Sequence, residues 1–375
     1  MIFRSVNEES KMNIIIGNKS QKTQKIQLKL NKINEKYDIS FYPEIILLRK
    51  GHACEFTVEI KPYCSLDIED ELMIISVDIN KGKRTVIPIK MRIKTKQTTK
   101  LNPDEIKEKK KKGEGSFGIV YKGYFKGNKV AIKKMKNVND TQKVMVEFEK
   151  EVNMLDKFRN DYLIHFYGAV FIPNKICMVT EFAQYGSIKD LIKKRKENPI
   201  DEFLKVKILC DCAKGIEYLH SNGILHRDIK PDNFLVISLK NDVKVNAKLT
   251  DFGSSRNINQ LMTNITFTKG VGSPAYMSPE VLDRKKYKMP ADIYSFAITM
   301  LEVMIWNNAF PKTDYPFAWN ITESVSKGLR PESINEIEYE NIKKLIEMCW
   351  CQDPKDRFKI NDVNALLETE LIKMK

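Results

Sequence analysis

The first hundred residues alternate short apolar runs with polar clusters, which is typical of β-strands. Apolar side chains recur at every second position, as at Phe56, Val58 and Ile60, so one face of such a strand would be buried. Seven runs of this kind follow one another: MNIIIG, KIQLKL, YDISFY, EIILL, EFTVEI, ELMIISVDI and TVIPIKMRI. The segment shows no convincing helical period. The pattern predicts an all-β sandwich over residues 1–97.

The hydrophobic period changes after a short polar segment. Residues 98–105 are mostly polar and contain Pro103, so they are predicted to be a linker. GIVYKGYF, NKVAIKKM and KICMVTEF are then expected to form strands, and MVEFEKEVNMLDKF has apolar positions at helical spacing. Beyond residue 187 the long segments are mostly helical: LKVKILCDCAKGIEYLHS, ADIYSFAITMLEVMIW, YENIKKLIEMCW and VNALLETELIK. Strands followed by helices predict a bilobal α+β unit over residues 106–375.

Composition agrees with a folded chain of about two domains. The 375 residues are 42% hydrophobic and 30% charged, which excludes a wholly disordered chain. The longest apolar-rich stretch, Tyr294 to Trp306, contains Glu302 and is too short for a membrane span. The start MIFRSVNEES is too polar for a secretory signal, and the C-x-C cysteine pairs lack zinc-site spacing. We therefore expect reduced thiols and a cytoplasmic location.

The formal net charge of +15 is spread along the chain. The first 100 residues carry 19 Lys and Arg against 12 Asp and Glu, and the remaining residues carry a similar excess. This indicates a lysine-rich soluble surface; no nucleic-acid partner is expected, and membrane contact has no support beyond the charge. One dense cluster stands at Lys107 and Lys109–Lys112. It is either a phosphate or lipid patch or a solvated strand edge.

A glycine-rich segment opens the second half of the chain. Gly113, Gly115 and Gly118 lie in GEGSFG, a spacing that lets backbone approach phosphates. A dinucleotide-binding fingerprint needs a helix after the glycines, whereas here two strands follow. The context favours a flap that covers phosphates, and a plain turn is the alternative.

A lysine follows on the next predicted strand. Lys133 ends Val-Ala-Ile-Lys, and a lysine on a buried strand must pair with an anion or shift its pKa. Nucleotide phosphates and the helix carboxylate Glu151 are the candidate anions. The alternative is an ordinary lysine whose ammonium reaches the surface.

Two polar segments carry groups suited to phosphoryl transfer. Residues 225–233, LHRDIKPDN, place Asp228, Lys230 and Asn233 close together, and KLTDFG adds Asp251. Asp228 could accept the proton of a hydroxyl and Lys230 could stabilise a transferring phosphoryl group. Asn233 and Asp251 are oxygen ligands that suit Mg²⁺ rather than zinc. A turn rich in Asp, Asn and Pro explains either segment taken alone.

Taken in order, these motifs resemble a eukaryotic protein kinase domain. The resemblance covers residues 106–375 and includes the glycine-rich loop, the strand lysine, the catalytic loop, Asp251-Phe252-Gly253 and the A-P-E-like Ser278-Pro279-Glu280. It implies a β-rich small lobe, a helical large lobe, and use of ATP and Mg²⁺.

The resemblance also assigns roles to single residues. Asp228 would be the catalytic base, assisted by Lys230, while Lys133 would contact phosphates and pair with Glu151. Asn233 and Asp251 would hold Mg²⁺. The remaining nucleotide contacts would come from Gly113, Glu114, Gly115, Ser116, Phe117, Gly118, Val120, Ala131, Thr180, Glu181 and Ala183. Asp292 would anchor the catalytic loop, and Glu280 and Arg357 would form a buried ion pair.

The acceptor and the regulation follow from smaller features. Lys230 and Gly272-Ser273-Pro274-Ala275-Tyr276 resemble serine/threonine kinases, and Cys349-Trp350 resembles tyrosine-kinase-like members. Together they indicate the tyrosine-kinase-like serine/threonine branch, acting on protein substrates in signalling. Dual specificity or a pseudokinase scaffold is the alternative. Arg227 could bind a phosphate on Thr263, Thr266 or Thr268.

The first domain carries no catalytic constellation. Phe41-Tyr42-Pro43, EIILLRKG and EFTVEIKPYC are similar to major-sperm-protein or PapD-type immunoglobulin-like sandwiches. This resemblance implies a binding or regulatory module for a peptide or protein partner, and a simple packing module is equally open.

Overall fold

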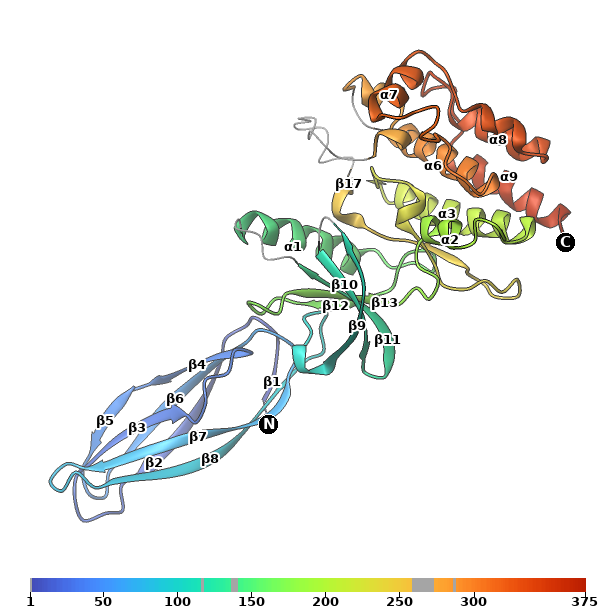
Figure 1. Cartoon of the computed structure of the whole chain (residues 1–375). Coiled ribbons are helices and arrows are strands. Elements are labelled where there is room, and N and C mark those ends of the chain that lie inside the picture. The colour runs from blue at the N-terminus through green and yellow to red at the C-terminus, as the bar shows by residue number, and fades with distance from the viewer. Residues whose placement is uncertain (1, 116–117, 136–140, 258–272, 286–287) are drawn as a thin grey trace. The chain divides into compact units, whose positions relative to one another are not determined.

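A computed structural model describes the chain except for residues 1, 116–117, 136–140, 258–272 and 286–287 (Figure 1). Contacts divide the chain into two units. The first comprises Met1–Asn137 and Tyr167–Thr180, and the second comprises Val138–Phe166 and Glu181–Lys375.

The N-terminal part of the first unit is a β-sandwich, as the alternation predicts. One sheet has the order β1 (Ile2–Arg4), β8 (Arg84–Thr95), β7 (Asp67–Asp78), β3 (Gln24–Leu30) and β5 (Ile45–Leu48). The other has the order β2 (Ser10–Gly17), β6 (Ala53–Pro62) and β4 (Tyr37–Tyr42). Both sheets contribute to one core, in which Leu28 and Leu72 meet Phe56 and Val58. β1 was not predicted, because three residues are too few to show a period.

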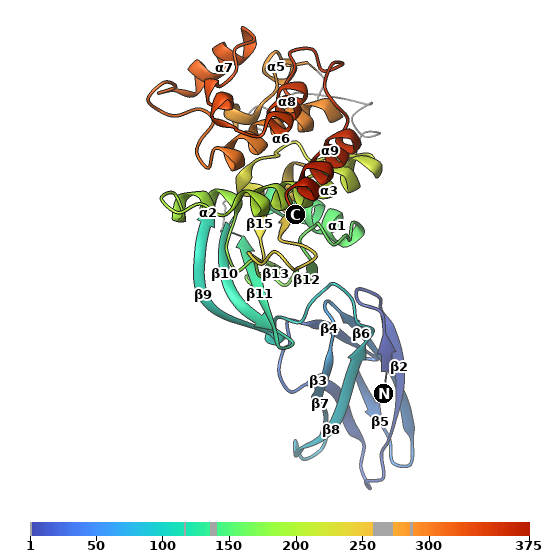
Figure 2. The ribbon, with the colours of Figure 1, turned by 90° about the vertical axis from the view of Figure 1, so that its right-hand side faces the viewer.

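The same unit contains a further five-stranded sheet, in which β10 is antiparallel to both β9 and β11. Its order is β12 (Phe166–Val170), β13 (Cys177–Glu181), β11 (Asn128–Met135), β10 (Gly118–Phe125) and β9 (Ile106–Gly115) (Figure 2). β9 is an edge strand, and the side chains of Lys107 and Lys109–Lys112 are exposed on it. The basic cluster therefore lies on an exposed strand edge, a placement that discourages pairing with other chains.

The polar segment before β9 is hydrogen-bonded to the sheet that contains β12. A short 3₁₀ turn, η1 (Pro103–Glu105), lies within the predicted linker. Lys100 forms a parallel bridge with Ala169. The Leu101 N–H donates to the Ala169 carbonyl at 2.9 Å, the Ala169 N–H donates to the Thr99 carbonyl at 2.7 Å, and Leu101 is buried. Residues 99–101 thus extend the sheet beside β12, and the boundaries predicted at 97 and 105 stay predictions.

The second unit is mainly helical. Its helices are α1 (Thr141–Lys157), α2 (Ile188–Lys194), α3 (Glu202–Ser221), α5 (Pro279–Leu282), α6 (Met289–Met304), α7 (Ala318–Ser326), α8 (Glu340–Cys349) and α9 (Ile360–Lys373). α6 is buried along nearly its whole length, and α3 packs against both α6 and α9. The side chain of Asp201 caps α3 by accepting the Leu204 N–H at 2.8 Å. Within the described part of the chain, no helix has the length and apolarity needed to span a membrane.

Short strands and turns in this unit position the chemistry. They are β14 (Ile224–Leu225), η2 (Pro231–Asn233), β15 (Phe234–Val236), β16 (Ala247–Leu249), η3 (Phe252–Ser254), β17 (Arg256–Asn257), η4 (Pro274–Tyr276) and η5 (Glu332–Glu336). β14 pairs with β17, and β15 pairs with β16. These two pairs of short antiparallel strands place the segment around Asp228 beside the segment around Asp251. The sequence alone could not show that the two segments are neighbours.

Candidate active site

Two candidate catalytic side chains and one candidate metal ligand meet in the loop between β14 and β15. The Lys230 ammonium lies 2.7 Å from Asp228 Oδ2. Asn233 Nδ2 donates to the Asp228 carbonyl at 2.7 Å and to Asp228 Oδ2 at 3.0 Å. Asp228 keeps 14% of its side chain exposed, whereas Asn233 is buried. The loop therefore fixes one carboxylate between a cation and an amide donor while leaving part of it accessible.

The backbone of this loop is held by one buried carboxylate. Asp292, in the first turn of α6, accepts the N–H of His226 at 3.0 Å and the N–H of Arg227 at 2.9 Å. His220 Nε2 lies 2.9 Å from the same carboxylate. Burial alone would raise the pKa of Asp292, but the bonds from His220 and the loop amides keep that pKa below its usual value. Arg227 has φ of 71°, and these anchors hold that strained conformation.

The second acidic segment is tied to the same loop. The Thr250 N–H donates to the Asn233 carbonyl at 2.9 Å, and His226 Nε2 lies 2.9 Å from the Thr250 carbonyl. The rings of Phe252 and His226 pack edge to face with centroids 5.6 Å apart. Asp251 follows directly after Thr250 and has φ of 62°. The side chain of Asp251 is thus presented from a fixed, left-handed turn beside Asn233.

Asn233 and Asp251 have the chemistry of a Mg²⁺ site. Asn233 Nδ2 is occupied by two oxygens of Asp228, which leaves Oδ1 as the atom that can coordinate a cation. A carboxylate and an amide oxygen are ligands that Mg²⁺ accepts when phosphates complete its shell. Across the described residues there is no cluster of three or more His, Cys, Asp or Glu side chains with metal-site geometry. The two residues therefore fit a cation that arrives with phosphate ligands.

Glu151 lies on α1 beside the Asp251-Phe252-Gly253 turn. A Cβ atom added to Gly253 would lie 3.4 Å from Asp251 Oδ1 and 3.9 Å from Glu151 Oε2. Glu151 is 8% exposed. Two carboxylates thus approach the same glycine, and a buried carboxylate of this kind requires a cationic partner.

The glycine-rich hairpin and Lys133 belong to the first unit. Gly115 pairs with Gly118 at the end of the β9–β10 hairpin, and Val120 pairs with Lys133 across β10 and β11. A Cβ atom at Gly118 would lie 2.1 Å from the Lys134 carbonyl oxygen, so only glycine fits there. Nothing lies within 4 Å of a Cβ at Gly113.

The other candidate nucleotide contacts in this unit have varied surroundings. Ala131 pairs with Lys122 on β10, and the Glu114 carboxylate accepts from the Lys111 ammonium at 2.7 Å. Thr180 is half-buried near the end of β13. Ser116 and Phe117 lie outside the described residues.

The segment expected to bind adenine has a defined hydrogen-bond pattern. The Glu181 N–H donates to the His165 carbonyl at 2.9 Å. Glu181 Oε1 accepts from the His165 N–H and from Lys248 Nζ, each at 2.6 Å. The side chain and amide of Glu181 are therefore structural. Among the hydrogen bonds of the described residues none uses the Ala183 N–H, so that amide can serve a ligand.

Two residues near the catalytic loop were not on the candidate list. Ser273 Oγ lies 3.4 Å from the Lys230 ammonium, at the start of η4. His220 supports Asp292 from the end of α3. Ser273 stands in a motif that the sequence analysis used for specificity, whereas a single histidine at a helix end carries no pattern. Thr263, Thr266 and Thr268 lie outside the described residues.

The expected ion pair in the helical unit is confirmed. Arg357 Nη1 and Nη2 each lie 2.8 Å from a different oxygen of Glu280, and the Arg357 side chain is fully buried. The guanidinium also donates to the Pro290 carbonyl at 2.9 Å. This pair ties α5 to the segment before α9 and keeps the region after Ser273 in place.

A glycine-rich hairpin and a strand lysine on one sheet, with an Asp-Lys-Asn loop and an Asp-Phe-Gly turn among helices, define a protein kinase. Comparison with known proteins agrees: residues 106–367 match the family described as Protein kinase domain. The chain belongs to the protein kinase family, as expected from its motifs.

Several similar proteins are named as kinases and are much longer than this chain. The chain is 32% identical over 90% of its length to "Probable serine/threonine-protein kinase gdt9" of Dictyostelium discoideum. A second protein of that organism, also named "Probable serine/threonine-protein kinase", is 35% identical over 70% of the chain, and "Putative serine/threonine-protein kinase/receptor R818" of Acanthamoeba polyphaga mimivirus is 34% identical over 70%. The chain spans only 22%, 28% and 15% of the length of these three relatives.

Proposed function

We propose that the chain transfers the γ-phosphoryl group of Mg-ATP to serine or threonine hydroxyls of protein substrates, in a signalling role. The observation that carries the proposal is the position of Asp228, whose partly exposed carboxylate is fixed by Lys230 and Asn233. A base held in this way is suited to a hydroxyl, because phosphoryl transfer depends on positioning and charge stabilisation more than on covalent catalysis.

Each residue then has a task in the transfer. Asp228 orients the acceptor hydroxyl and takes its proton as the oxygen attacks, while Lys230 moves its charge from Asp228 toward the transferring group. Asn233 Oδ1 and Asp251 would hold Mg²⁺, which when bound neutralises charge on the phosphates. Asp292 keeps the loop amides fixed, so Asp228 needs little reorganisation.

Nucleotide binding is assigned to the candidate residues of the kinase motifs. Gly113, Gly115 and Gly118 would cover the phosphates with Glu114, Ser116 and Phe117. Lys133 would contact the phosphates, with Glu151 as its counter-charge. Val120, Ala131 and Thr180 would line the base. Since the Glu181 N–H is already used by His165, Glu181 would offer its carbonyl oxygen and Ala183 its N–H to adenine.

The serine/threonine preference rests on Lys230 and its neighbour Ser273, at 3.4 Å. The relatives named above carry the same acceptor class in their names. The branch, the substrates and the partner of the N-terminal sandwich remain predictions.

The test uses the purified chain with radiolabelled ATP and a peptide library that contains serine, threonine and tyrosine acceptors. We expect label on serine and threonine peptides that disappears when EDTA removes Mg²⁺. Label confined to tyrosine peptides would overturn the acceptor class. Binding of nucleotide without transfer to any peptide or to the chain itself would favour a scaffold.

A further inference from the structure

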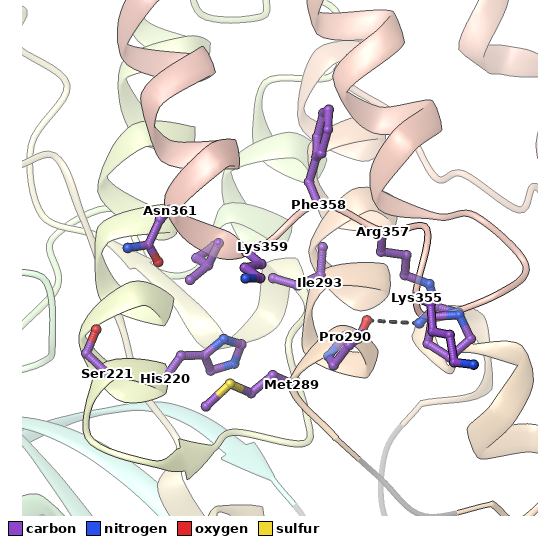
Figure 3. A pocket seen from close by; sticks show the side chains of 12 residues that line it. His220, Ser221, Met289, Pro290, Ile293, Lys355, Arg357, Phe358, Lys359 and Asn361 are labelled. Atoms are coloured by element: carbon purple, nitrogen blue, oxygen red, sulfur yellow. Dashed lines mark hydrogen bonds between the residues drawn. The ribbon is translucent and has the colours of Figure 1, made fainter.

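A pocket of about 380 Å³ lies within the helical unit, and no residue of the Asp228 loop lines it (Figure 3). It is enclosed by the end of α3, the start of α6, and the segment that leads into the start of α9. Figure 3 shows side chains from all three of these places around it. Its volume falls in the range of sites that hold small molecules, and neither the motifs nor the proposed transfer reaction uses it.

The pocket wall is apolar with a cationic rim. Met289, Ile293 and Ile360 provide apolar surface, and no Asp or Glu is among the residues that line it. Lys355 and Lys359 also line it; both are exposed, and neither forms an ion pair in the part of the chain that the structure describes. The positive charges of these two lysines favour an anionic ligand, which can form charge-assisted hydrogen bonds with both ammonium groups. An uncharged or cationic ligand would lack this charge complementarity.

The third cation of the lining is already neutralised. Arg357 is bound to both oxygens of Glu280, and it donates to the Pro290 carbonyl, as the dashed line in Figure 3 marks. The lining therefore offers two available lysine charges next to a fixed guanidinium, together with apolar walls. This combination suits a ligand that has one anionic end and one apolar body.

A largely buried histidine also lies on the pocket wall, next to the carboxylate that holds the catalytic loop. His220 lines the pocket and is 7% exposed. Its Nε2 is bound to Asp292, but no hydrogen bond of the described residues involves its Nδ1. The Nδ1 atom is not among the buried side-chain atoms that lack a hydrogen-bond partner, so solvent reaches it, and a polar group of a ligand could take the place of that solvent.

We propose that this pocket binds a small organic anion with an apolar body, an aryl carboxylate in size and charge, and that binding restrains the catalytic loop through His220 and Asp292. The chain of contacts is short: His220 meets Asp292, and Asp292 holds the N–H groups of His226 and Arg227. Binding itself is independent of the proposed kinase activity, and only an effect on phosphoryl transfer rests on it.

The first experiment measures binding to the whole chain with indole-3-propionate as the probe and its neutral amide as the matched comparison. We expect saturable binding of the carboxylate by calorimetry, with a dissociation constant of about 1 mM or lower, and at least tenfold weaker binding of the amide. Lys355→Glu with Lys359→Glu should weaken the carboxylate at least tenfold. Lys193→Glu with Lys194→Glu, on α2 and outside the pocket lining, should leave it unchanged.

Three outcomes would overturn the site. They are no saturable binding up to about 20 mM, equal binding of acid and amide, or equal losses in the two double variants. A negative result in the kinase assay would leave each of these measurements valid, so failure of the pocket and failure of the enzyme assignment are distinguishable.

The second experiment tests the link to the loop without using activity. Hydrogen exchange of the peptide that contains the His226 and Arg227 amides is followed with and without saturating probe. We expect the probe to slow exchange of these amides at least threefold in the wild-type chain. In Asn361→Trp, a larger side chain replaces an exposed residue of the pocket lining, and we expect exchange to stay at the rate measured without probe. Unchanged exchange in a saturated wild-type chain would overturn the coupling.

Discussion

At the scale of single residues, the proposed phosphoryl transfer depends on the charge of Asp228. Asp228→Asn keeps an oxygen that can accept from Asn233 Nδ2 but removes the negative charge beside Lys230. We expect phosphoryl transfer to fall by about 10²–10⁴-fold, because a general base is lost, while nucleotide affinity changes little. Radiolabel transfer and a nucleotide titration measure the two quantities.

The matched control is Asp232→Asn in the same loop. Asp232 is exposed, so this variant makes the same chemical change four residues away without touching the base. It should transfer phosphate at the wild-type rate. Equal activity in Asp228→Asn and Asp232→Asn would contradict the assignment of Asp228.

A second residue-scale prediction concerns a buried acid outside the site. Asp211 on α3 accepts from the N–H groups of Asn246 and Ala247 at 2.6 and 3.1 Å through one oxygen. Burial raises the pKa of Asp211 to about 6, from an ordinary value of 3.8, despite these two bonds. Between these pH values the folded chain binds more protons than the unfolded chain, so stability falls as pH rises, by about 2–3 kcal/mol in all.

Asp211→Asn should remove this pH dependence, because asparagine keeps one oxygen for both amides and carries no charge. We expect the variant to be more stable than wild type at pH 7 and similar to it near pH 4, in urea unfolding at both pH values. Asp314→Asn, at an exposed position, serves as the control and should follow wild type throughout. A variant that is less stable than wild type at pH 7 would contradict the reasoning.

At the scale of elements, the Glu280–Arg357 pair joins α5 to the segment before α9. Glu280→Gln would leave a fully buried guanidinium without its counter-charge. Removing one partner of such a pair costs about 3–5 kcal/mol of unfolding free energy, which urea denaturation would detect as a lower midpoint. Glu323→Gln breaks an exposed ion pair on α7 and should leave the midpoint unchanged. Equal midpoints for both variants would argue against the structural role.

The elements also show what a sequence can predict. The alternation of apolar residues in β6 and the helical spacing in α3, α6, α8 and α9 could be recognised in the sequence. These segments are long, and each buries at least one face, so the apolar pattern repeats several times. The short helices α5 and α7 and the three-residue strand β1 were missed, since they carry too few periods. Motif spacing predicted that Asp228, Lys230 and Asn233 lie close together, and their side chains do. It could not identify the meeting of Lys230 with Ser273, which depends on how separate segments pack.

At the scale of the whole molecule, the predicted linker shows why a polar composition does not imply a free tether. Leu101 is 4% exposed, and residues 99–101 exchange backbone hydrogen bonds with β12. The Ser65 N–H of the sandwich also donates to the Lys100 carbonyl at 2.8 Å. The sandwich and the β9–β13 sheet are therefore joined by a hydrogen-bonded segment with a buried leucine, and we expect them to unfold together.

Gly168 on β12 is the position at which this junction can be tested. A Cβ atom there would lie 2.3 Å from the Thr99 carbonyl oxygen and 2.7 Å from the Leu101 side chain. We expect Gly168→Ala to lower the unfolding free energy by about 1–3 kcal/mol, the usual effect of overpacking, and to accelerate hydrogen exchange at the Leu101 and Ala169 amides. Gly17→Ala on β2 adds the same methyl group at ordinary contact distance, 3.9 Å from Ala53, and should change neither quantity. If Gly168→Ala left exchange at Leu101 and Ala169 unchanged, the expectation that the sandwich and the β9–β13 sheet unfold together would be contradicted.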